Sequence, residues 1–217
     1  MLFLNLMLNF SSSAASDSAK ITLPEPRHKS NVSIEETMLH IKSVRQYSDR
    51  ALSIQGVAQL LWAAQGIKNT SGKRTAPSAG ATYPLEVYAI AGNIQGITRG
   101  IYKYKPHQHE LIKTMDVDYR EALTRAALNQ QFIAQAPLNI IITAVYERTT
   151  GRYGGRGIRY VHMEAGHAAQ NVCLQAVAMN LGAVVVGAFD DNQVAKALKL
   201  PDDEVPLYII PVGKPAD

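Results

Sequence analysis

The chain has 217 residues, of which 47% are hydrophobic and 18% are charged, as in a single globular domain that buries its own core. A net charge of +4 is too small to indicate a nucleic-acid-binding surface, so no nucleic-acid partner is expected. Cys173 is the only cysteine, which excludes an intrachain disulfide and a metal cluster held by cysteines.

Residues 1–31 are interpreted as an N-terminal arm and linker, and residues 32–217 as the domain. The apolar run from Leu2 to Phe10 makes a poor secretory signal, because no Lys or Arg precedes it, and it is too short to span a bilayer. We favour an arm that contacts a dimer partner or is disordered, in a cytoplasmic protein without membrane association. Export by a weak signal stays the alternative.

Capping residues mark where the helices are expected to begin. Ser33 and Glu36 form a capping box, so a helix is predicted from about Ile34. Ser53 opens a second helix, which Gly66 ends. Three further helices are expected, at residues 119–128, at about 160–181 with Gly182 as its stop, and after Asp190 or Asp191.

Short apolar runs between turn signals predict the strands. The run 138–145 is almost continuously apolar, as in a central strand. The segment 149–157 is rich in Gly and Arg and predicts a flexible basic loop. The fold class is therefore α+β, with helices packed on a central mixed or mostly antiparallel sheet. The other strands are expected at 85–91, at 183–191, at 206–212 and in a hairpin formed by 100–104 and 110–113.

The segment from Arg74 to Pro84 is the most informative stretch of the sequence. Its small residues let the main chain approach something flat, and Pro77 stiffens it. Gly80 permits a bend or a close approach that a Cβ atom would block. The apolar run that follows places this loop at the mouth of a sheet, where it suits a planar cofactor better than a catalytic triad.

Two other segments offer groups for an anionic ligand. Lys42, Ser43 and Arg45 supply two cations and a hydroxyl group that can grip a phosphate, and Lys214 adds a further cation. The alternative is a helix C-terminus whose cations complement its dipole. The segment 186–189 lies where a strand turns toward a helix, so its N–H groups can donate to a ring nitrogen. The alternative is a simple tight turn that needs Gly187. Together, the three segments offer what flavin mononucleotide (FMN) requires.

Six motifs carry a resemblance to a known family: ITLPEPR at 21–27, KSVRQY at 42–47, LLWAAQG at 60–66, RTAPSAG at 74–80 with YPLEVY at 83–88, EAGHAAQN at 164–171 and VGAFD at 186–190. With them the chain resembles the nitroreductase superfamily of FMN enzymes, and within it the SagB-type dehydrogenases, over about residues 21–215. The resemblance implies a nitroreductase-like fold and an intertwined homodimer with two FMN sites at the subunit interface.

The resemblance also implies roles for individual residues. Ser43 and Arg45 hold the phosphate, with Lys42 and Lys214 nearby. Pro77, Ser78, Ala79 and Gly80 approach the flavin ring, from the other subunit in many members. In the segment 186–188, the N–H groups of Gly187 and Ala188, next to Val186, point toward the flavin N5 atom. Gln130 lies at the pyrimidine edge of the ring.

Two positions depart from the family pattern. Ile41 and Lys42 stand where the family often has two consecutive Arg, so FMN is expected to bind less tightly. Azoline-oxidising relatives have a Lys-Tyr pair where this chain has Arg152 and Tyr153. Because Arg stays protonated, it is a poor base. Azoline oxidation is therefore disfavoured, and Tyr153 is the single candidate catalytic residue, or a residue that lines the pocket.

The primary hypothesis is an FMN-dependent oxidoreductase that NADH or NADPH reduces and that passes hydride to a nitroaromatic or quinone acceptor by a ping-pong mechanism. One alternative is a dehydrogenase that oxidises an azoline or another small ring, and another is a flavin-binding protein without turnover. No metal is expected, because His162 and His167 are five residues apart and do not share a helix face well.

Overall fold

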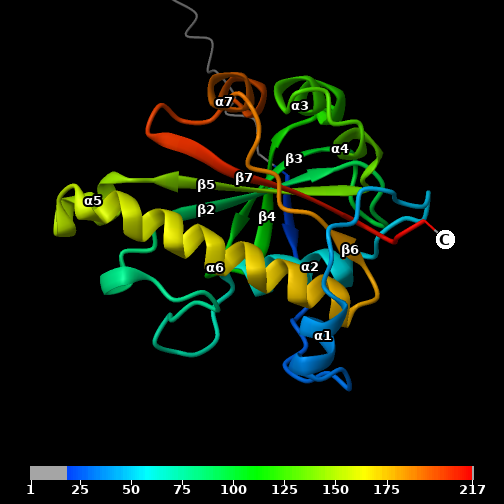
Figure 1. Cartoon of the computed structure of the whole chain (residues 1–217), viewed down its shortest axis with the longest axis horizontal. Coiled ribbons are helices and arrows are strands. Elements are labelled where there is room, and N and C mark those ends of the chain that lie inside the picture. The colour runs from blue at the N-terminus through cyan, green and yellow to red at the C-terminus, as the bar shows by residue number, and fades with distance from the viewer. Residues whose placement is uncertain (1–18, 217) are drawn as a thin grey trace, which may run out of the picture.

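A computed structural model describes residues 19–216, and the expectations for Leu2–Phe10 lie outside this range. Seven strands form one sheet in the order β1-β4-β3-β2-β5-β7-β6, in which all neighbouring strands are antiparallel (Figure 1). This confirms the predicted sheet. The strands are β1 Lys20–Thr22, β2 Leu85–Ala91, β3 Gly100–Lys105, β4 Glu110–Met115, β5 Leu138–Val145, β6 Gly182–Ala183 and β7 Glu204–Gly213.

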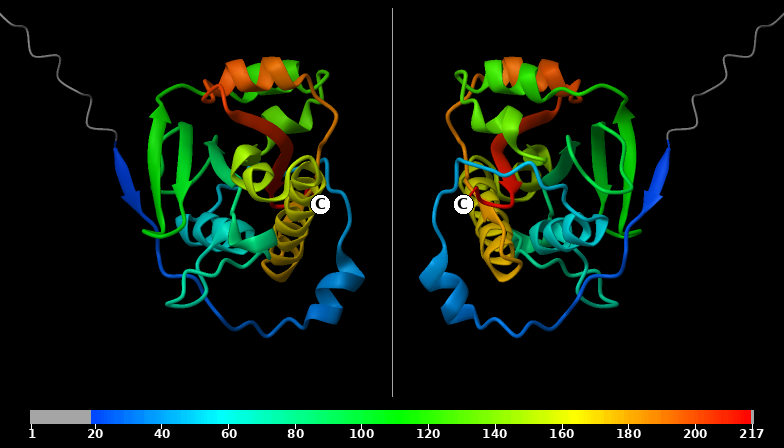
Figure 2. Two further views of the ribbon diagram at one scale, coloured as in Figure 1. Left: turned by 90° about the vertical axis from the view of Figure 1, so that its left-hand side faces the viewer. Right: turned by 90° about the vertical axis from the view of Figure 1, so that its right-hand side faces the viewer.

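Helices cover both faces of the sheet, and the two further views in Figure 2 show these layers edge-on. On one face, α2 and α6 bury one hydrophobic cluster, and on the other α3, α4 and α7 bury a second. No helix within residues 19–216 is long and apolar enough to cross a bilayer. The helices are α1 Ile34–His40, α2 Ile54–Gln65, the 3-10 turn η1 Ala79–Ala81, α3 Arg120–Ala126, α4 Phe132–Gln135, α5 Glu147–Tyr153, α6 Arg156–Ala178 and α7 Asp191–Leu198.

The predicted helix starts are confirmed by their capping hydrogen bonds. The Ser33 hydroxyl accepts from the N–H of Glu36 at 3.0 Å, and the Ser53 hydroxyl accepts from that of Gly56 at 3.1 Å. Asp190 caps α7 in the same way. Each side chain satisfies a backbone donor that has no partner within its helix.

The prediction of a flexible loop at 149–157 is wrong. Its first half forms the end of α5, and α6 begins at Arg156 after a turn at Gly154, which has a φ of 56°. Thr149 is buried, and its hydroxyl lies 2.8 Å from that of Thr82. Tertiary packing therefore overrides the low helix propensity of the glycines.

Two other boundaries differ from the prediction. Lys20–Thr22, expected in the linker, pairs with β4, so the folded unit begins before residue 32. Helix α6 ends at Ala178, before the predicted stop at Gly182. Asn180, with a φ of 55°, adopts the left-handed conformation that ends the helix. Gly182 serves another purpose, because a Cβ atom there would lie 2.6 Å from the Val44 side chain.

The strand expected at 183–191 is mostly irregular. Only Gly182–Ala183 forms β6, and beyond it Val186 makes an isolated bridge to Ile209 of β7. The remaining residues turn away from the sheet toward Asp190, the cap of α7. This irregular backbone leaves polar groups without sheet partners next to the sheet edge.

Candidate active site

The segment after α1 carries three of the predicted phosphate-binding residues along the edge of the sheet. Its Val44 N–H donates to the Ala183 carbonyl at 3.0 Å, and Ser43 forms a parallel bridge with Ala183. The Tyr47 hydroxyl donates to the Val44 carbonyl at 2.7 Å, which fixes the segment further. Burial raises the pKa of Tyr47, so its hydroxyl stays protonated as a donor.

Side chains alternate along this extended segment, and this alternation separates the predicted cations. Lys42 and Val44 line a cavity of about 580 Å³, which Lys214 also lines. Ser43 and Arg45 do not line it, and both are exposed. Lys42 and Lys214 thus both line the cavity, while Ser43 and Arg45 face the other side of the segment.

Arg45 faces helix α4, which lies next to the 187–188 turn. Its guanidinium lies 5.9 Å from the ring centroid of Phe132, at the start of α4. Two residues earlier, the Gln130 side chain donates to the Ala188 carbonyl at 3.0 Å. The structure therefore places Arg45, Gln130 and the 187–188 turn around α4. The sequence analysis did not predict Phe132 as a neighbour of the candidate site, although it lies only two residues after Gln130.

The turn at Gly187 and Ala188 is exposed, and within residues 19–216 no backbone group accepts from either N–H. A Cβ atom on Gly187 would meet the Tyr208 ring only at an ordinary 3.6 Å, so the turn itself does not require glycine. The Val186 N–H donates to the Ile209 carbonyl at 2.8 Å, so Val186 could contact a ligand only through its other atoms. Two free donors therefore remain at this turn.

The small-residue loop lies against α5. Gly80 has a φ of 60°, and its carbonyl accepts from the Arg152 guanidinium at 3.0 Å. A Cβ atom at Gly80 would lie 2.5 Å from the Tyr153 hydroxyl, so the close neighbour of this glycine is Tyr153. Pro77 is exposed at the surface of the loop, and Ala79 is half-buried. The loop thus presents small residues outward on a helical support.

A buried polar cluster lies behind this loop, and the sequence analysis did not assign it to the site. The Ser78 hydroxyl accepts from the N–H of Tyr83 at 2.9 Å, and it faces Glu164 of α6. Glu164 is 3% exposed, and its Oε1 atom has no hydrogen-bond partner within the described residues. Burial raises its pKa from 4.5 to about 7, against the opposing influence of Ser78 and Arg74.

The sequence did contain a signal for this cluster. Glu164 falls on the same helical face as the apolar residues Val161, Ala165 and Ala168, all of which are buried. A carboxyl group in an apolar stripe is costly to bury unless it is neutral or paired. His162 and His167 are instead exposed, so Glu164 and the two histidines do not converge.

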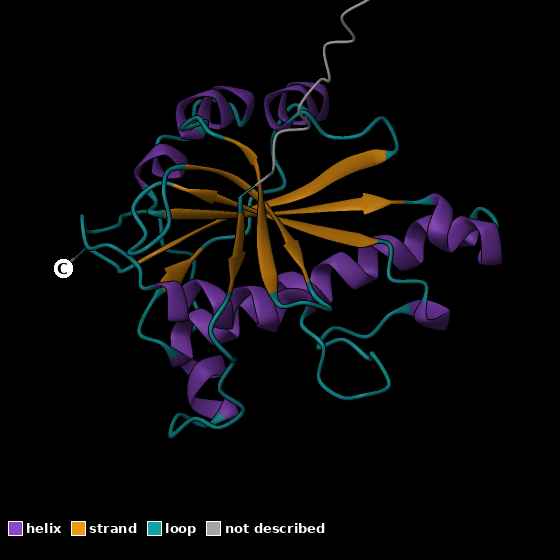
Figure 3. Cartoon of the chain, turned by 180° about the vertical axis from the view of Figure 1, so that it is seen from behind, coloured by secondary structure: helices purple, strands orange, loops and turns teal. Residues whose placement is uncertain are grey.

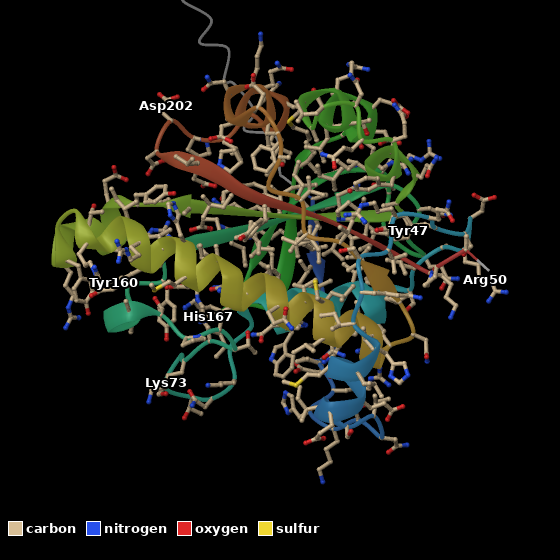
Figure 4. The ribbon with its side chains drawn as sticks, viewed as in Figure 1. Tyr47, Arg50, Lys73, Tyr160, His167 and Asp202 are labelled. Atoms are coloured by element: carbon tan, nitrogen blue, oxygen red, sulfur yellow. The ribbon has the colours of Figure 1, made fainter. Side chains whose placement is uncertain are left out.

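One chain does not bring the loop and the phosphate-binding segment together. The loop lies beside α5 and the first turns of α6, whereas Lys42–Arg45 lies beyond the last turn. Helix α6 has 23 residues and is therefore about 35 Å long. It crosses the whole sheet (Figure 3), and Figure 4 shows Tyr160 toward one end of the molecule and Tyr47 toward the other. A single flavin cannot touch both half-sites of one chain.

The chemistry of these donors fits FMN. A hydroxyl and a guanidinium side by side suit a phosphate, and two free N–H groups suit the polar edge of a flavin ring. Small residues on a rigid loop allow a flat ring to come close. The fit requires that the loop come from another copy of the chain.

Comparisons with known proteins show which family the chain resembles. Residues 41–214 match the family model described as Nitroreductase family. The chain is 44% identical over 198 residues to a protein of Methanocaldococcus jannaschii named as a nitroreductase, MJ1384, covering 91% of this chain and 98% of that one. It is 27% identical over 166 residues to the microcin B17-processing protein McbC of Escherichia coli, covering 73% of this chain and 61% of McbC.

A solved structure from Anabaena variabilis, also described as a nitroreductase, superposes with a TM-score of 0.81 at 30% identity. The match covers 92% of this chain but only 42% of the Anabaena chain. This chain therefore spans less than half the length of that protein.

Proposed function

The chain belongs to the nitroreductase family of oxidoreductases, and we propose that it is a homodimeric FMN enzyme that transfers hydride from NADH or NADPH to a nitroaromatic- or quinone-type acceptor. The observation that carries this proposal is the presence of two complementary half-sites at opposite ends of α6. One half-site offers anion-binding groups and free N–H donors, and the other offers a rigid surface of small residues. A two-fold dimer would complete the site twice.

Bound FMN would supply the group that accepts and returns hydride. Ser43 and Arg45 would hold its phosphate by charge-assisted hydrogen bonds. The N–H groups of Gly187 and Ala188 would donate to the polar edge of the ring and stabilise negative charge there. Because reductant and acceptor would both have to lie over the same ring beside the partner's small-residue loop, they would bind in turn, as in a ping-pong mechanism.

The similarity to McbC supports a second candidate, a SagB-type dehydrogenase that oxidises an azoline or another small ring. Tyr153 is the candidate for moving a proton in that reaction, because its hydroxyl lies against Gly80 of the small-residue loop. Arg152 donates to the Gly80 carbonyl, so it positions the loop, and a guanidinium group has no acceptor with which to take a proton.

A spectroscopic experiment distinguishes these candidates. The protein is purified, supplied with FMN, desalted, and then mixed anaerobically with NADH or NADPH. Yellow protein that loses its colour with a nicotinamide and regains it with a quinone or nitroaromatic acceptor is the expected result. Yellow protein that responds to neither nicotinamide would favour the azoline-type dehydrogenase or a flavin-binding protein, and protein that retains no FMN would overturn the proposal.

A further inference from the structure

Arginines without acidic partners gather beside the small-residue loop. Arg152, Arg156 and Arg159 are exposed, and none of them forms an ion pair with any residue in the described range 19–216. Arg148 of the same region differs, because it pairs with Glu86 at 2.6 Å. These three guanidinium groups are therefore left without a close acidic partner in the described part of the chain.

Two tyrosines form an aromatic surface among these arginines. The rings of Tyr153 and Tyr160 meet edge to face, with centroids 5.2 Å apart and an interplanar angle of 86°. The Arg152 guanidinium lies 5.5 Å from the centroid of Tyr153, and that of Arg156 lies 5.6 Å from the centroid of Tyr160. Aromatic faces attract flat rings, and guanidinium groups bind carboxylates and phosphates in a planar, bidentate way.

This Arg/Tyr surface, defined as Arg152, Tyr153, Arg156 and Tyr160, directly adjoins the small-residue loop. Arg152 donates to the Gly80 carbonyl, and the Tyr153 hydroxyl occupies the space beside Gly80 that a Cβ atom would need. A ligand that lies in front of the loop therefore meets the Arg/Tyr surface at its edge. A cluster of positive charges also raises the local concentration of negatively charged ligands.

We propose that the Arg/Tyr surface binds an aromatic ligand that carries a negatively charged group. This inference rests on the proposed function, because the ligand would be a substrate of the same site. Two sources share the chemistry: an anionic electron acceptor, such as an aromatic carboxylate, and NADPH, whose additional phosphate distinguishes it from NADH. The two sources are separated by the arms of one experiment.

The experiment compares the wild type with Arg156→Ala. Arg156 is the better position to change, because Arg152 also holds Gly80. The acceptor arm measures kcat/KM for 4-nitrobenzoate and for the neutral 4-nitrobenzamide, and the reductant arm measures kcat/KM for NADPH and for NADH. The substitution is expected to lower kcat/KM for the more negatively charged member of one pair, 4-nitrobenzoate or NADPH, by at least about fivefold more than for its partner. The affected arm identifies the source.

Arg125→Ala is the matched control, because Arg125 is an exposed arginine on α3, in the helix layer on the other face of the sheet. It should leave both ratios as in the wild type. Added salt should reduce the preference for the anionic ligand in the wild type and have a smaller effect in Arg156→Ala.

A binding measurement separates this inference from the proposed function. Calorimetric titration of the purified protein with 4-nitrobenzoate, 4-nitrobenzamide, NADP+ and NAD+ needs no turnover, because none of these ligands can reduce the flavin. Tighter binding of the more negatively charged ligand of one pair, lost in Arg156→Ala, supports the Arg/Tyr surface even if no acceptor is reduced. If the substitution affected both members of each pair equally, in turnover and in binding, the inference would be overturned. FMN retention and turnover of neutral acceptors test the proposed function and do not depend on this outcome.

Discussion

The chemistry of the Glu164 carboxyl depends strongly on its surroundings. It is buried behind Ser78, with an Oε1 atom that has no partner in the described part of the chain. Because burial raises its pKa to about 7, the folded protein holds a proton there that the unfolded chain releases at lower pH. Folding is therefore linked to proton binding at this position.

Glu164→Gln should change how stability depends on pH. Since the folded pKa is raised, the contribution of the wild-type residue is fully present below the unfolded value of 4.5 and is lost as pH rises through about 7. Relative to the wild type, Glu164→Gln should therefore gain about 2–3 kcal/mol in free energy of unfolding between pH 5 and pH 8.5. Denaturant titrations at several pH values measure this, and parallel profiles for the two proteins would contradict it.

Gly80 of the small-residue loop and Gly151 of α5, the helix that supports this loop, make a matched pair of glycines. Gly80→Ala should lower the free energy of unfolding by about 1–3 kcal/mol, because its φ is 60° and the new Cβ would meet Tyr153. Gly151 lies within α5 with open space around its Cβ position, so Gly151→Ala should raise it by about 0.5–1 kcal/mol. Denaturant titration distinguishes them, and a similar effect at both positions would count against this account of the loop.

At the scale of elements, the helix caps and the long apolar strands could be predicted because they depend on local chemistry. Ser33 and Ser53 cap their helices as expected, and β5 covers the predicted range. The helix α5 could not be predicted, since its Gly- and Arg-rich sequence becomes helical only by packing on the distant loop through Thr149. Strand β1 was missed for a related reason, because it gains its hydrogen bonds from β4, about ninety residues later.

The extended segment after α1 carries a prediction of its own. Arg45 and Lys42 are exposed cations three residues apart, but Lys42 faces the cavity whereas Arg45 lies on Phe132, toward the 187–188 turn. If the phosphate binds on the Arg45 side, Arg45→Ala should weaken FMN binding by at least about tenfold, through loss of a charge-assisted hydrogen bond. Lys42→Ala should weaken it less.

Equilibrium dialysis with FMN measures both dissociation constants, and Arg125→Ala controls for net charge. A larger effect of Lys42→Ala than of Arg45→Ala would move the phosphate site into the cavity. Unchanged FMN binding in both variants would remove the segment from the site.

At the scale of the molecule, the sequence suggested the segments of the candidate site but not how they are distributed. The phosphate-binding segment, the 187–188 turn and Gln130 lie around α4, while residues 77–80 lie at the other end of α6. Spacing along the chain contains no information about this distance, which depends on the length of α6 and its course across the sheet. Glu164 and Phe132 were missed because their roles come from neighbours that only the fold provides.

The surface also carries apolar residues that a second copy would cover. On α1, Ile34, Met38 and Leu39 are exposed, and Leu39 is 80% exposed. On α6, Ile158 and Met163 are exposed as well. Both helices lie on the same side of the sheet, with α1 farther from it than α6 (Figure 1). Such a surface suits a dimer contact, and a contact along α6 would place the opposite ends of two chains side by side.

The most direct test of a shared site is complementation between two defective chains. Arg45→Ala removes the phosphate contact, and Ala79→Trp fills the surface of the small-residue loop. The two variants are co-expressed with different tags, so that mixed dimers can be isolated by tandem purification, and far-UV circular dichroism checks that each variant folds. FMN bound per dimer is then measured.

Each variant alone should lose FMN at both sites. In the mixed dimer, a shared arrangement puts both changes in one site and neither in the other, so FMN should return to one site per dimer. Mixed dimers that bind no more FMN than their parents would show that each site is built from a single chain and would contradict the account.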